Sequence, residues 1–94
     1  MNQDTDREQL LANLFRETFR AHHQAYIEMD GLDEEWPLWY AAYLHEKLQE
    51  LLKTKITQSE LVYLLVLLSQ EQPQRAPDAD WPTYYARFFV ERYP

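Results

Sequence analysis

The chain has 94 residues, with 16 acidic side chains against 9 basic ones and a formal net charge of −7. This charge argues against nucleic-acid binding and against docking on an anionic membrane, both of which need a basic surface. There is no cysteine, which excludes disulfides, thiolate catalysis and cysteine–zinc sites. The start of the chain has no signal-peptide pattern. We therefore expect one soluble, cytoplasmic domain over residues 1–94.

The first segment predicts a helix from about residue 6 to about residue 29. Thr5 and Glu8 have the spacing of a capping box, in which each side chain bonds the backbone amide of the other residue. Apolar residues then recur every three or four positions, which indicates one buried face. Gly31, the only glycine, suits a left-handed helix stop.

A phrase then appears that the chain repeats 45 residues later: residues 33–47 and 78–92 align without gaps. Trp-Pro, Tyr-Ala and a later glutamate are identical in the two copies, and the positions between them carry similar residue types. The pattern predicts an internal repeat with halves of about 5–48 and 57–93. The helices that precede the two copies are not similar in sequence, so the prediction of an internal repeat rests on the similarity of the two phrases alone.

Each copy of the phrase predicts the start of a helix. Proline is favoured at the first helical position, and the residue before it avoids the helical region. Trp36-Pro37 and Trp81-Pro82 are therefore predicted to begin helices. A second possibility is that the earlier of these helices starts at Asp33 and accommodates Pro37 in its first turn.

A third helix is predicted between the copies. Thr57 and Glu60 form another capping box, which favours a helix over a buried strand for Leu61 to Leu68. This run is apolar all round, so we expect the most buried helix of the protein here. Pro73 is expected to end it, and the last helix should cover about residues 82–92. The expected fold is all-α, a compact four-helix domain built from two similar αα-hairpins with approximate two-fold symmetry.

Aromatic residues of both copies are candidates for a binding surface. Together they could line a groove for an apolar ligand or a partner segment. The position of Trp36 and Trp81 beside proline favours instead a ring that fills the core. The second aromatic flank, which helix amphipathicity does not require, is the stronger candidate for an interaction surface; it comprises Trp39, Tyr43, Tyr84 and Phe88.

A histidine-based site is the alternative. If the first two helices form an antiparallel hairpin, His22 and His45 approach each other beside Glu46 or Glu17, as a rudimentary metal or acid–base site requires. Ordinary packing of these histidines explains the same pattern. Glu46 and Glu91 are equivalent in the two copies, but a glutamate followed by a base is typical of a solvated helix face.

Together these observations predict a non-enzymatic protein-interaction or assembly module that pairs with itself or with another protein. The alternative is a small-ligand or metal-binding domain that uses His22, His45 and the aromatic flank. An enzyme ranks third, because no serine–histidine–acid set and no glycine-rich phosphate loop can be found. No cofactor is predicted.

Overall fold

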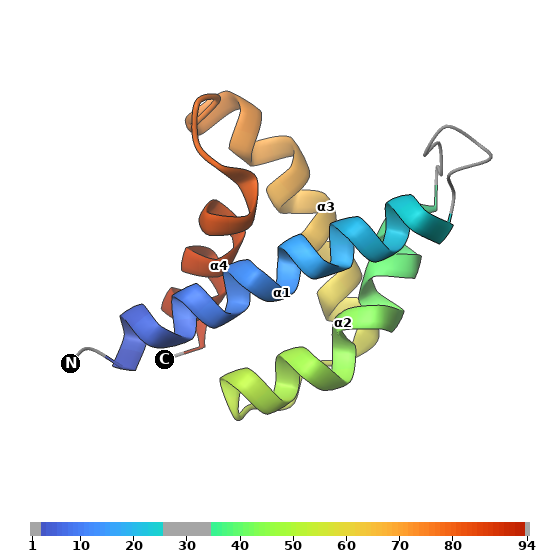
Figure 1. Cartoon of the computed structure of the whole chain (residues 1–94), viewed down its shortest axis with the longest axis vertical. Helices are drawn as coiled ribbons and strands as arrows, with labels where there is room; N and C mark the ends of the chain where they lie inside the picture. The colour runs from blue at the N-terminus through green and yellow to red at the C-terminus, as the bar shows by residue number, and fades with distance from the viewer. Residues whose placement is uncertain (1–2, 26–34, 94) are drawn as a thin grey trace.

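The computed structural model describes residues 3–25 and 35–93, which form four α-helices and no strand. The helices are α1 (Gln3–Ala25), α2 (Trp36–Leu52), α3 (Gln58–Arg75) and α4 (Trp81–Arg92) (Figure 1). The Cα radius of gyration is 13.1 Å, close to the value of about 13 Å expected for a folded chain of 100 residues. The prediction of a compact all-α domain with four helices is confirmed.

The two Trp-Pro steps begin α2 and α4, as predicted. Pro37 and Pro82 lie in the first turn, where proline's missing N–H would have no helical partner. The two helices differ in their N-terminal caps. Asp80 accepts a hydrogen bond from the backbone N–H of Thr83, whereas Glu35 makes no side-chain cap to α2. The alternative start at Asp33 falls outside the described residues.

The start of α1 differs from the prediction. The helix begins at Gln3, so Thr5 lies inside its first turn and is not the N-cap residue. Propensity and charge cannot place a helix start to better than one or two residues, because the first turn frays. The described part of the helix ends at Ala25. The predicted end near residue 29 and the stop at Gly31 lie outside the described residues.

The start of α3 was predicted correctly and its end was not. Thr57 Oγ1 accepts a hydrogen bond from the backbone N–H of Glu60 at 3.0 Å, which caps the helix. Pro73 does not end α3, because the helix continues to Arg75. Proline costs the helix one hydrogen bond, and a helix can lose it in its last turn. Gln72 also holds the turn that follows, donating from Nε2 to the carbonyl of Ala76 at 2.8 Å.

The expectation that α3 is the most buried helix was also wrong, because α2 and α4 each have five buried residues and the longer α3 has four. One face of the helix is fully buried, whereas the Tyr63 side chain is 64% exposed and the valines are half-buried. A helix buried on every side is not needed here, because the core draws on all four helices and on Ile56 in the loop before α3. Its largest fully buried hydrophobic members are Leu11, Phe15, Leu44, Leu48, Leu61, Leu64, Leu65, Leu68 and Phe89.

The helices pair across the chain. α1 packs most extensively on α4, and α2 packs on α3, with a further contact between α1 and α2. In Figure 1, α1 crosses the molecule and its first turns lie beside α4. Arg7 Nη2 donates to the carbonyl of Tyr93 at 2.6 Å, which joins the beginning of α1 to the end of α4. This packing is consistent with helical hairpins, and the two-fold repeat stays a prediction.

Candidate aromatic cleft

The two copies of the repeated phrase meet in an open cleft. Its volume is about 320 Å³, and we call it the aromatic cleft. Of the residues that the structure describes, five aromatic side chains and two neutral polar ones line it, and no charged side chain does so. The lining residues are Phe19 of α1, Trp36 and Tyr40 of α2, Ser69 and Gln72 of α3, and Trp81 and Tyr85 of α4.

Each copy contributes a tryptophan and a tyrosine one turn apart. Residues four positions apart lie on the same face of a helix, so each pair projects together. The rings of Trp36 and Tyr40 are 5.3 Å apart at 83°, and those of Trp81 and Tyr85 are 4.9 Å apart at 67°. Edge-to-face contacts of this kind hold both rings of a pair in place. The cleft therefore has two similar walls from equivalent positions of the repeat.

α1 supports the wall on α4 from two sides. Phe15 is fully buried, and its ring lies 6.2 Å from that of Trp81 and 5.7 Å from that of Tyr85. Phe19, one turn later, is 50% exposed and meets Trp81 at 6.1 Å in an edge-to-face contact. One face of α1 thus supplies both a buried support and an exposed edge of the aromatic cleft.

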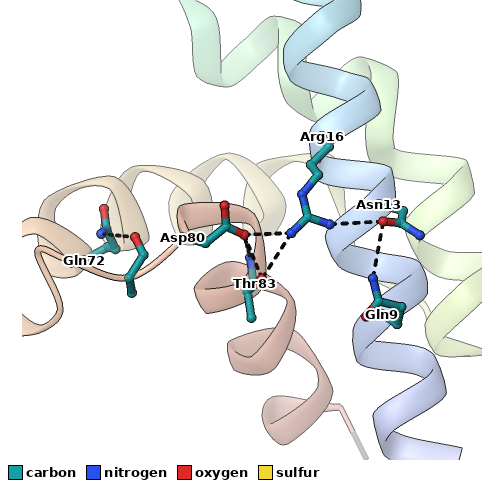
Figure 2. A network of polar contacts seen from close by, with 7 residues as sticks. Gln9, Asn13, Arg16, Gln72, Asp80 and Thr83 are labelled. Carbon is teal, nitrogen blue, oxygen red and sulfur yellow. Dashed lines mark hydrogen bonds and ion pairs between the residues drawn. The ribbon is translucent and has the colours of Figure 1, made fainter.

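A polar network fixes the start of α4 beside the aromatic cleft. Figure 2 shows Arg16 reaching from α1 to Asp80 and Thr83, with Nη2 at 2.8 Å from Asp80 Oδ2 and 3.3 Å from Thr83 Oγ1. Hydrogen bonds from Thr83 and Arg16 lower the pKa of Asp80, which keeps the cap charged. Because Trp81 follows Asp80 directly, this network holds the tryptophan at the edge of the cleft.

The polar groups of the aromatic cleft are neutral. Burial raises the pKa of Tyr40 and of Tyr85 to about 12, so both hydroxyls stay protonated at neutral pH. Gln72 donates from Nε2 to the carbonyls of Ala76 and Ala79, which leaves Oε1 as an acceptor. Rings and neutral hydrogen-bonding groups of this kind are suited to binding rather than to proton transfer.

The predicted aromatic flank is held within the chain. Trp39 and Tyr43 stack at 5.4 Å and lie against α1, where the Tyr43 hydroxyl donates to Glu17 at 2.8 Å. Lys47 binds the same carboxylate at 3.2 Å. On α4, the Tyr84 hydroxyl donates to Glu71 of α3 at 2.9 Å.

All four side chains of the flank are half-buried: Trp39, Tyr43, Tyr84 and Phe88. The first pair faces α1 and Tyr84 faces α3, so the contacts do not join them into one surface. Their role in binding stays a prediction.

The two candidate histidines are held at different places: His22 of α1 lies against the start of α2, and His45 of α2 contacts the loop that follows this helix. His22 is buried, with its ring 5.0 Å from Trp39 and 5.3 Å from Tyr40, near the start of the helix. His45 bonds through Nε2 to the carbonyl of Ile56, in the loop after the helix. Because a carbonyl only accepts, that nitrogen carries the proton. Gln49 accepts from the Ile56 N–H at 2.9 Å, so both residues fasten this loop.

In the part of the chain that the structure describes, no cluster of metal-ligating side chains supports the hypothesis of a metal-binding domain. Glu46 is exposed on α2, away from the Ile56 contact that engages His45. In residues 3–25 and 35–93, no group of three or more histidine or acidic side chains is placed to hold a metal ion.

Only some of the residues that line the aromatic cleft could be singled out from the sequence. Trp36 and Trp81 are predicted to fill the core; both pack against it and also line the cleft. Tyr40 and Tyr85 stand out only as identical positions of the repeat. The signal that points to them is the identical Trp-x-x-x-Tyr spacing in both copies, since the start of a helix requires only the proline.

No protein-family model matches the chain, and no curated protein or solved structure is similar enough to show a relationship. Of the described helices, none is long and apolar enough to cross a membrane.

Proposed function

We propose that the protein is a non-enzymatic interaction module whose aromatic cleft takes one side chain of a partner protein. The observation that carries this proposal is the meeting of two equivalent Trp–Tyr pairs around an open cleft whose described lining is aromatic or neutral. Tryptophan and tyrosine are the residues most enriched among those that dominate binding energy at interfaces. A volume of about 320 Å³ is at the small end of ligand pockets, and it suits one inserted side chain better than a large molecule.

The charge of the chain favours a basic partner over a second copy. Two copies would each bring a formal charge of −7 to the contact, and like charges oppose association. Acidic residues also precede both cleft tryptophans in the sequence, at Asp33, Glu34 and Glu35 and again at Asp78 and Asp80. A basic segment of another protein is therefore the occupant that the chain favours.

Site-specific photo-crosslinking in cells tests this proposal. A photoreactive phenylalanine analogue in place of Phe19 reports on the aromatic cleft, and the same analogue in place of Phe88 reports on the flank. Tyr63, exposed on α3, is the control position. We expect a discrete adduct from position 19 that disappears when Trp36→Leu is added.

The outcomes separate the candidate surfaces. An adduct from position 88 alone would move the interface to the flank, and equal labelling from all three positions would contradict a localised site. The partner found at position 19 must also bind the purified chain, and Trp36→Leu must weaken that binding. A small-ligand function of the same cleft is the second candidate, and an adduct-free position 19 would favour it.

A further inference from the structure

We propose that the side chain received by the aromatic cleft carries a methylated ammonium group, as trimethyllysine does. The inference rests on the proposed function and names the chemistry that the cleft recognises. The faces of aromatic rings attract cations, most strongly for tryptophan, when the cation lies within about 6 Å of the ring centroid. Five rings from three helices line this cleft, two of them tryptophans.

The angles between the rings suit a cage. Trp36 meets Tyr40 at 83°, Trp81 meets Tyr85 at 67°, and Phe19 meets Trp81 at 62°. Rings set near right angles form adjacent walls, whereas parallel rings would stack and close the space between them. A roughly spherical group with methyls on every side fills such a box, and a flat ligand does not.

The lining also discriminates between methylated and unmodified ammonium. An unmodified lysine brings three N–H donors, each of which loses a water when it is buried. The polar acceptors of the cleft are few: Gln72 Oε1, the Ser69 hydroxyl, whose own proton bonds Val66, and the tyrosine hydroxyls. A trimethylammonium group has no N–H to satisfy, so it binds in such a site at lower cost.

The surrounding charge favours a cation. An adjoining hollow shares Phe19 and Trp81 with the cleft and contains Arg16 and Arg20. The first arginine is matched by Asp80 at 2.8 Å, so it adds little net charge. The second, Arg20, carries one positive charge, which the net charge of −7 outweighs.

Binding to the purified full chain tests the inference, with tryptophan emission and calorimetry as readouts. Choline is compared with 3,3-dimethyl-1-butanol, in which carbon replaces the charged nitrogen. We expect the cation to bind about tenfold or more tightly than the neutral isostere, because only the cation gains the ring attraction. A short glycine- and serine-flanked peptide with trimethyllysine should bind more tightly than choline, and the unmodified peptide at least tenfold more weakly.

The variants are matched. Trp81→Leu should abolish selectivity for the cation, while Trp39→Leu, which changes the flank, should keep it; circular dichroism verifies that both fold. If Trp81→Leu does not fold, the comparison of choline with its neutral isostere on the unaltered chain still tests the inference. Equal or tighter binding of the isostere overturns the inference and leaves the cleft as an interaction site. Tighter binding of choline than of the trimethyllysine peptide would show that the cleft does not recognise a side chain of a protein. If no cation binds, the inference is wrong, and the crosslinking experiment still tests the proposed function separately.

Discussion

Arg16 on α1 and Asp80 at the start of α4 form an ion pair, with 2.8 Å between Nη2 and Oδ2 (Figure 2). The same Oδ2 atom accepts from the Thr83 hydroxyl at 2.7 Å and from the Thr83 N–H at 3.3 Å. One carboxylate oxygen thus caps α4 and joins it to α1. Because Trp81 is the next residue, the position of the cleft wall depends on this contact.

Substitution of Asp80 separates its two roles. Asp80→Ala removes the cap and the ion pair, and we expect a loss of about 1–2 kcal/mol in the free energy of unfolding. Asp80→Asn keeps a capping oxygen and should cost less than about 1 kcal/mol, because exposed ion pairs contribute little. Urea unfolding followed by circular dichroism measures both. Equal losses for the two variants would mean that the cap contributes nothing.

The effect of acid on Asp80 has a definite sign. Its pKa is lowered in the folded protein, so its contribution is present above the ordinary aspartate pKa and is lost as the pH falls through the lowered value. The difference between the unaltered chain and Asp80→Asn should therefore shrink on acidification below about pH 4. A difference that stays constant down to about pH 2 would contradict this assignment.

Phe15 should be far more sensitive than Phe19 to the same change. Phe15→Leu removes ring contacts to Trp81, Tyr85 and Phe89 inside the core, and we expect a cost of about 1–2 kcal/mol. Phe19→Leu, one turn along the same helix, should cost less than about 0.5 kcal/mol because its ring is half exposed. Thermal and urea unfolding compare the two, and similar costs would show that Phe15 is not the support of the cleft wall.

Removal of the flank hydroxyls should change stability little. Tyr43→Phe loses the bond to Glu17 and Tyr84→Phe loses the bond to Glu71, and the carboxylates stay partly solvated. We expect each variant to lose less than about 1 kcal/mol of unfolding free energy. The contribution of Glu17 and Lys47 should also weaken in salt. A loss of several kcal/mol would instead show that these bonds hold α2 to α1 and α4 to α3.

Alkaline pH should destabilise the fold through the cleft tyrosines. Burial raises the pKa of Tyr40 and Tyr85 to about 12, above the value of about 10 in an unfolded chain. The unfolded chain then loses these protons first, so stability is complete below about pH 10 and falls as the pH rises toward about 12, by at most about 2–3 kcal/mol for each tyrosine. Urea unfolding between about pH 9 and about pH 12 checks the slope, and Tyr40→Phe should reduce it.

Local signals in the sequence predicted the starts of α2, α3 and α4 but not that of α1, and the packing of the helices depends on contacts that no local signal shows. Trp36-Pro37, Trp81-Pro82 and Thr57 act within one turn, so the sequence shows them directly. Pro73 misled because its local cost is tolerated where α3 is already in its last turn. Four-residue spacing places Trp81 beside Tyr85. Nothing in that spacing shows that Phe19 meets them from α1, or that the two pairs share one cleft.

The pairing of α1 with α4 has a consequence for the order of folding. The ring contacts of Phe15 are to α4, so the central aromatic cluster closes a loop of more than 60 residues. Such closure costs entropy before any contact repays it, and a high sequence separation slows folding. A ribosome that has released α1 to α3 therefore presents a chain in which the Phe15 ring, fully buried in the folded protein, is still exposed. We expect that intermediate to need protection from aggregation until α4 emerges.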